Sequence, residues 1–215
     1  MEIYELLYDR YGPQHWWPGN SRFEVIVGAI LTQNTNWGNV EKAIANLKAA
    51  DCLTAKHLHK LDTQSLAELI RPAGYFNIKA KRLKNFLNWL FDNYDGDLAR
   101  FESFSADVLR EVLLMINGIG PETADSIALY AFDKTVFVVD AYTCRVMGRH
   151  GLIEQGANYQ QVKDFFESNL ETNTKLFNEF HALLVRVGKD HCRPKAKCNG
   201  CPLESLSHDA NPPEF

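Results

Sequence analysis

A glycine-rich turn and a nearby carboxylate are the two features of this sequence most suited to chemistry. Gly118, Ile119 and Gly120 precede Pro121, which suits the first turn of a helix because proline lacks an N–H that would be unpaired there. Glycines permit a tight turn, and the N–H groups at a helix N-terminus attract phosphate. Asp140 follows Gly120 by twenty residues. Its carboxylate is a candidate catalytic group, and it is also suited to cap the next helix.

Three of the five cysteines lie close together, at Cys192, Cys198 and Cys201. An odd number of cysteines in a sequence without an evident export signal favours a reducing compartment, so we expect a cytoplasmic protein. Clustered thiols in such a compartment indicate a metal site rather than disulfides. Cys52 and Cys144 have no such neighbours, and we expect them to pack as ordinary small side chains.

Aromatic residues gather near the N-terminus, where Trp16, Trp17 and Pro18 are followed by Trp37. One interpretation is simple core packing. The other is a stacking pocket, because aromatic faces attract cations.

The rest of the sequence, which must position the turn, Asp140, the cysteines and the tryptophans, has helical periodicity almost throughout. Residues 23–31 are nearly all apolar and predict a buried helix, and small residues recur at helical spacing after Gly120, which permits close helix packing. The one strand-like segment, residues 135–139, is short and has no partner of similar character. The sequence therefore predicts an all-α fold.

The overall composition is that of an ordinary globular protein, with 46% hydrophobic and 23% charged residues. No apolar run approaches a membrane span, so we expect no membrane association. The net charge of −4 weakens a simple nucleic-acid argument, but basic residues cluster locally. These clusters are either solvated faces or phosphate contacts, and they comprise Lys79, Lys81, Arg82 and Lys84, and Arg186, Lys189, Arg193, Lys195 and Lys197.

Four segments in the same order resemble the endonuclease III superfamily of helix-hairpin-helix DNA glycosylases. They are residues 23–35, 70–80, 116–145 and 188–201. The resemblance implies two all-α lobes with a DNA cleft between them. The central lobe would span residues 22–134 and contain the hairpin. Residues 1–21 and 135–215 would form the second lobe. The expected partner is damaged double-stranded DNA, bound by a monomer.

The resemblance also gives Asp140 and Glu122 roles. Asp140 matches the catalytic Asp of the family, whose carboxylate stabilises an oxocarbenium-like sugar and orients water. Glu122 stands where bifunctional members carry a lysine, which attacks C1′ to form the Schiff base that leads to strand cleavage. Because a carboxylate cannot form an imine, we expect a monofunctional enzyme that leaves an abasic site. Glu122 is also an ordinary acidic residue for the first turn of a helix.

Further positions match the DNA-contacting parts of the family. The hairpin residues Gly118, Ile119 and Gly120 would bind phosphate, and Lys79 belongs to a shared segment. Gln33 and Asn34 match positions where the family inserts a polar side chain into the space vacated by a flipped base. Either amide is alternatively a loop-stabilising group.

The tryptophans, Glu122 and the segment after residue 31 are more similar to the bacterial 3-methyladenine glycosylase branch than to the oxidised-pyrimidine branch. We therefore expect a DNA glycosylase that acts on alkylated purines. Two alternatives remain open: an endonuclease III-like glycosylase with lyase activity on oxidised pyrimidines, and a non-catalytic helix-hairpin-helix DNA-binding protein.

The three cysteines resemble the tail that holds a [4Fe–4S] cluster in this family. The interval between Cys192 and Cys198 is one residue shorter than in the family. Ser207 occupies the fourth cysteine position, with His208 next to it. Three thiolates with His208, Ser207 or water would hold a cluster. Zinc bound by three cysteines and a histidine and a tail without metal are the alternatives.

Overall fold

The computed structural model describes residues 1–17 and 19–210, and every regular element in these ranges is helical. The all-α prediction is therefore confirmed. None of the helices described has the length and apolar character needed to cross a membrane. The elements are α1 (Glu2–Tyr11), α2 (Arg22–Leu31), α3 (Trp37–Ala49), α4 (Ala55–Lys60), α5 (Thr63–Leu69), η1 (Arg71–Ala73), α6 (Phe76–Tyr94), η2 (Leu98–Ser103), α7 (Ala106–Leu114), α8 (Pro121–Phe132), α9 (Ala141–Arg149), α10 (Tyr159–Asn169) and α11 (Thr174–Asp190).

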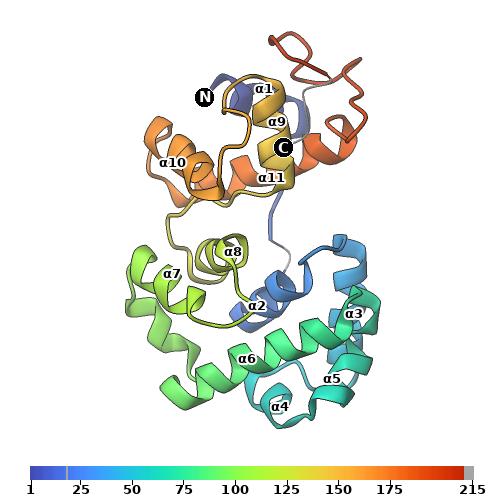
Figure 1. Ribbon diagram of the computed structural model, residues 1–215, viewed down its shortest axis with the longest axis vertical. Coiled ribbons are helices and arrows are strands. Elements are labelled where there is room, and N and C mark those ends of the chain that lie inside the picture. The colour runs from blue at the N-terminus through green and yellow to red at the C-terminus, as the bar shows by residue number, and fades with distance from the viewer. Residues whose placement is uncertain (18, 211–215) are drawn as a thin grey trace. The chain divides into compact units, whose positions relative to one another are not determined.

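The chain divides into two compact units. One contains residues 17–134, which include α2 to α8, and the other contains residues 1–16 with the chain from 135 onward, which includes α1 and α9 to α11 (Figure 1). The sequence-based boundary lay at residue 22, whereas here residue 17 already groups with the central unit.

The buried helix α2 is the core of the central unit. Ser21 caps it by accepting a hydrogen bond from the Glu24 N–H, and every residue from Phe23 to Leu31 is buried. A helix that is apolar on all sides must be covered by its neighbours. α8 packs against α2 and presents small buried residues, which allow the two backbones to approach closely. These residues are Ala124, Ala128 and Ala131.

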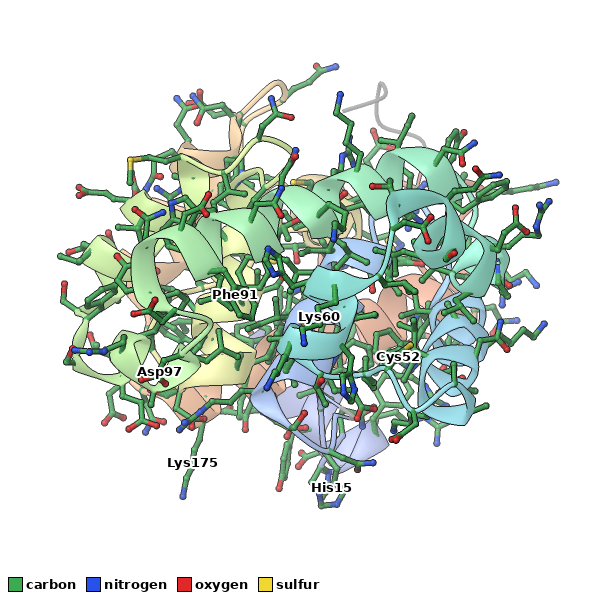
Figure 2. The ribbon with its side chains drawn as sticks, turned by 90° about the horizontal axis from the view of Figure 1, so that it is seen from below. His15, Cys52, Lys60, Phe91, Asp97 and Lys175 are labelled. Carbon is green, nitrogen blue, oxygen red and sulfur yellow. The ribbon has the colours of Figure 1, made fainter. Side chains whose placement is uncertain are left out.

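The long helix α6 carries one buried apolar stripe and supports the short helices beside it. The Lys84 ammonium donates to the carbonyl groups of His59 and Leu61 at the C-terminal end of α4, where the helix dipole favours a cation. The His59 ring also stacks on Phe91, with 4.1 Å between ring centroids. Figure 2 shows Phe91 on α6 and Lys60 at the end of α4.

In the other unit, residues 135–139 form an extended segment that pairs with no strand in the described ranges. Its side chains are buried from Val136 to Val139, and Phe137 stacks on Phe166 of α10 at 3.8 Å. Side chains satisfy the backbone that a sheet would otherwise pair: the Phe137 N–H donates to Glu167 at 2.8 Å. This buried segment leads directly to Asp140.

Candidate active site and nucleic-acid interface

The predicted hairpin is formed by α7, a turn at residues 115–120, and α8. Gly118 has a φ of +98°, a region that favours glycine, and a Cβ there would lie 2.3 Å from Cγ of Arg82. Gly120 is the N-cap of α8 and makes no side-chain cap bond. Ile119 is buried, so only its backbone can contact DNA. The first-turn N–H groups of α8 are therefore the candidate anion-binding element of the hairpin.

Side chains from two other segments hold the turn in place. The Gln33 amide donates to the Gly118 carbonyl at 3.0 Å and to the Thr123 hydroxyl at 2.9 Å. Its own carbonyl accepts a short hydrogen bond from the Arg82 guanidinium. One turn further along α6, Asn85 donates to the Asn117 carbonyl at 2.8 Å. We call Gln33, Arg82 and Asn85 the hairpin clamp.

This clamp separates the two amides that the sequence analysis treated together. Both polar ends of Gln33 are bound within the protein, so its side chain stabilises the hairpin in this structure. Asn34 is exposed and has a φ of +53°, a conformation that asparagine tolerates better than most residues. Of the two, Asn34 is the side chain presented to solvent.

Lys79 does not lie where a phosphate contact requires it. Its side chain is 1% exposed, and its ammonium donates to the Ala73 carbonyl at 2.7 Å. Burial, assisted by the nearby charge of Arg82, lowers the pKa of Lys79 to about 8. The expectation that Lys79 contacts DNA is corrected by this placement, because its side chain supports the turn before α6.

Glu122 lies in the first turn of α8 and is exposed. A carboxylate is favourable at this end of a helix dipole. The hairpin itself is braced by a buried ion pair between its two helices, in which Arg110 of α7 donates to Asp125 of α8 at 2.8 Å.

The tryptophans fall into different units. In the central unit, Trp17 packs edge-on against Trp37, with 4.9 Å between ring centroids, and lies 5.0 Å from Tyr130. Gly28 makes room for both indoles, since a Cβ there would lie 3.3 Å from Trp17 and 3.4 Å from Trp37. Trp16 belongs to the other unit, where the Lys189 ammonium lies 5.6 Å from its ring centroid. Pro18 lies outside the described residues.

Asp140 is the N-cap of α9. Its Oδ1 accepts hydrogen bonds from the Thr143 N–H at 2.7 Å and the Thr143 hydroxyl at 2.9 Å. The cap therefore fixes one oxygen and leaves Oδ2 outside the capping contacts. Capping and catalysis are compatible at this residue, because the cap holds the carboxylate in one orientation.

His181, on α11, lies beside that second oxygen, with 3.7 Å between its Nε2 and Oδ2 of Asp140. Burial lowers the pKa of this imidazole, although the Asp140 charge opposes the effect. No motif in the sequence points to His181; the one signal is a histidine among apolar residues on the buried face of a helix.

The three clustered cysteines line one pocket that is open to solvent, together with His150, His191 and His208. Ser207 is not among the lining residues; its carbonyl accepts from His150 Nδ1 at 3.0 Å. Burial and the neighbouring thiols Cys192 and Cys198 raise the pKa of Cys201. Within residues 1–17 and 19–210, no three His, Cys, Asp or Glu side chains converge closely enough to hold one metal ion.

Thiols and imidazoles are the donor types that iron–sulfur clusters and zinc use in proteins. Arg149 anchors the loop that carries the cysteines. Its guanidinium donates to the Arg193 carbonyl at 2.6 Å, the Pro194 carbonyl at 2.7 Å and the Cys192 sulfur at 3.2 Å. Sequence alone could not reveal this anchor, because Arg149 and the loop are more than forty residues apart.

Comparison with known proteins agrees with this geometry. Residues 27–172 match the HhH-GPD superfamily of base excision DNA repair proteins. The chain is 50% identical over 207 residues to MJ1434, a candidate DNA repair glycosylase of Methanocaldococcus jannaschii, covering 95% of this chain and 94% of that protein. It is 28% identical over 181 residues to endonuclease III of Sulfolobus acidocaldarius, covering 83% of this chain and 78% of that protein.

Two solved structures share the fold. The 3-methyladenine DNA glycosylase MagIII of H. pylori, bound to 1,N6-ethenoadenine, is 32% identical, covers 87% of this chain and 96% of its own, and has a TM-score of 0.76. An endonuclease III–DNA covalent intermediate has a TM-score of 0.82 at 20% identity, covering 95% of this chain and 92% of its own, which is a likeness of fold alone. The predicted superfamily is therefore confirmed: the chain belongs to the HhH-GPD superfamily of base excision DNA repair proteins, and within it to the DNA glycosylases.

Proposed function

We propose that this protein is a monofunctional DNA glycosylase that removes alkylated purines, and that it acts as a monomer on damaged double-stranded DNA. The observation that carries the proposal is the state of Asp140. One of its oxygens is fixed by the N-terminus of α9, and the other is left outside the cap. A carboxylate held in this way can face a developing positive charge without having to reorganise.

The reaction is a hydrolysis of the N-glycosidic bond. The C1′–N bond breaks, the base leaves with the bonding electrons, and the sugar passes through an oxocarbenium-like state that Asp140 stabilises. A water oxygen then bonds to C1′, and its proton passes to the carboxylate or to solvent. A purine alkylated at a ring nitrogen leaves as a neutral base, so little acid catalysis is needed.

Glu122 is the reason for proposing that the enzyme does not cleave the DNA strand. Its exposed carboxylate at the first turn of α8 offers no amine for imine formation. Lys79, a buried amine of the same unit, is bound to the Ala73 carbonyl and is 1% exposed. Neither residue supports a Schiff base.

The substrate class is proposed from the aromatic residues and from one relative. Trp17, Trp37 and Tyr130 form an aromatic cluster in the central unit, which suits an electron-poor or cationic base. MagIII, 32% identical, is a 3-methyladenine glycosylase with an ethenoadenine bound. The hairpin N–H groups would hold a phosphate, and Asn34 would enter the space left by the flipped base.

A single-turnover assay on a panel of lesions tests the proposal. Methylated DNA should release free 3-methyladenine, and strands should break only after alkali, which cleaves at abasic sites. Borohydride should trap no covalent adduct, and Asp140→Asn should release no base. Release of thymine glycol without alkylpurine, or a trapped adduct, would overturn the assignment. No release from any lesion by the wild-type protein would leave only DNA binding.

We also propose that the cysteine tail holds a [4Fe–4S] cluster through Cys192, Cys198 and Cys201, with His208 as the fourth ligand. His208 lines the same cavity, and its Nδ1 lies 2.8 Å from the Leu206 carbonyl. A donated bond there would leave Nε2 as the coordinating nitrogen. When bound, the cluster would order the loop that carries Arg193, Lys195 and Lys197. Ser207 is exposed and is absent from the cavity lining.

Iron content and absorption test this second assignment. Protein purified without oxygen should be brown and contain about four irons per chain. His208→Ala should lose or destabilise the cluster, whereas Ser207→Ala, its matched control, should not. Zinc at one equivalent, or the reverse ranking of the two variants, would contradict it.

A further inference from the structure

We propose that His181 controls the negative charge available at Asp140, and that protonation of its imidazole sets the acid limit of base excision. This inference rests on the proposed function, because it concerns the carboxylate to which that function assigns the chemistry.

The two carboxylate oxygens of Asp140 have different neighbours. Thr143 occupies Oδ1 with two hydrogen bonds, whereas His181 Nε2 lies 3.7 Å from Oδ2. That separation is too long for a hydrogen bond but is within ion-pair range. His181 therefore faces the oxygen that the helix cap leaves for the sugar.

Both side chains are largely buried. The side chain of His181 is 5% exposed and that of Asp140 is 14% exposed. His181 lies on α11 among buried apolar residues, including Phe177, Phe180 and Leu184. The imidazole thus lies on the protein side of Oδ2, in surroundings where a charge interacts strongly and is weakly screened.

Burial and two nearby charges act on the imidazole of His181. Burial lowers its pKa most; the Asp140 carboxylate raises it, and Lys189, also on α11, lowers it. The neighbouring helices bring further titratable groups that are engaged elsewhere in the unit. On α1, Tyr4 packs edge-on against Phe180. On α10, Lys163 pairs with Glu167 at 2.7 Å.

The direction of the effect follows from these charges. Because the pKa of His181 is below the usual histidine range, the imidazole is neutral at neutral pH. Asp140 then keeps its full negative charge for the oxocarbenium-like sugar. As the pH falls through the pKa of His181, the imidazolium pairs with Oδ2 and offsets that charge. We expect the excision rate to fall about tenfold or more.

The test is the pH profile of single-turnover release of 3-methyladenine from methylated DNA between pH 5 and 8.5. His181→Gln retains a polar side chain that cannot become protonated in this range. The fall in its excision rate at acid pH that protonation of the imidazole causes should disappear. At neutral pH its excision rate should remain within a few-fold of the wild-type rate. The control is His57→Gln, which alters an exposed histidine of α4 and should keep the wild-type profile. An unchanged acid limb in His181→Gln overturns the inference.

A second measurement does not depend on activity or on the stability of the His181 variant. The imidazole titration of His181 is followed by NMR in the wild type and in Asp140→Asn. Because the Asp140 charge raises the pKa of His181, that pKa should fall in Asp140→Asn. Equal values overturn the inference. If the pKa of His181 differs between the two proteins but the wild type releases no base at any pH, the proposed function is contradicted. The coupling between His181 and Asp140 would still hold.

Discussion

The glycine hairpin and the cysteine tail are both loops held by side chains from elsewhere in their own units, but of the two only the tail carries a group of thiols. In the hairpin, Gln33 and Asn85 bind backbone carbonyl groups, while the buried Ile119 fixes the turn from inside. Every anchoring contact is supplied by protein groups. The first-turn N–H groups of α8 are the proposed binding site for a phosphate.

In the tail, Arg145 and Arg149 bind backbone carbonyl groups in a similar way, with Arg145 donating to Cys192 O at 2.6 Å. The difference lies in the three thiols of the tail, which line a pocket open to solvent. Thiols around a pocket repel one another once deprotonated, and the proposed cluster would offset that repulsion. We therefore expect the hairpin to depend on its clamp, and the tail to depend on its arginines and on the proposed cluster.

The largest expected effect is that of removing the arginine of the tail. Arg149→Met should destabilise the unit by roughly 3 kcal/mol, because a buried guanidinium with three contacts to the loop is lost. Hydrogen exchange of residues 192–201 should accelerate, and thermal unfolding should report the loss. Arg145→Met is the matched control, with one loop carbonyl lost and a smaller expected effect. Equal effects of the two variants would show that Arg149 is no special anchor.

The next effect separates the two glycines of the hairpin. Gly118→Ala should cost roughly 2 kcal/mol, since a side chain is strained at a φ of +98° and its Cβ would meet Arg82. Gly120→Ala has an ordinary φ of −94° and no heavy atom within 4 Å of the added Cβ, so it should be nearly as stable as the wild type. It should nevertheless weaken DNA binding, because the methyl group lies where a phosphate would approach. Denaturant unfolding and a DNA-binding titration test the pair. Equal stability of the two variants would contradict the clamp.

Sequence patterns were sufficient for the parts of this molecule that depend on local spacing. The apolar run of residues 23–31 predicts the buried helix α2, and the Gly-Ile-Gly-Pro turn predicts the break between α7 and α8. The strand-like residues 135–139 were recognised as lacking a partner. Their role as a buried extended segment follows from side chains of α10 that satisfy the backbone.

The contacts that complete the candidate site could not be predicted, because they join residues far apart in the chain. Arg82 was one of several basic residues, and only folding places it against Gln33, 49 positions earlier. Lys79 was expected at DNA, but its position on the buried face of α6 turns it inward. The separation of Trp16 from Trp17 into different units is likewise invisible in a local motif.

A smaller effect distinguishes the adjacent amides Gln33 and Asn34. Gln33→Ala removes bonds to Gly118 and Thr123 and should cost about 1 kcal/mol of stability. Asn34→Ala should leave stability nearly unchanged and lower the rate of excision, because that exposed side chain is proposed to fill the space left by the base. Chemical denaturation and single-turnover kinetics separate the two effects. If Asn34→Ala lowers stability as much as Gln33→Ala, the assignment of Gln33 to hairpin stability and of Asn34 to excision is wrong.

The smallest effect concerns the opposite charges that the two loops would bring to DNA. The hairpin carries Glu122 beside its N–H groups, whereas the tail carries exposed Arg193, Lys195 and Lys197. Glu122→Gln removes a negative charge near the proposed phosphate and should raise affinity for undamaged duplex about twofold, with a stability change of less than about 0.5 kcal/mol. Lys195→Gln should lower affinity by a similar factor. The number of ions released on binding, which the salt dependence measures, should fall by about one. Binding titrations at several salt concentrations test both variants. If Glu122→Gln weakens binding, Glu122 supports the DNA contact, and the proposed electrostatic contrast between the hairpin and the tail is lost.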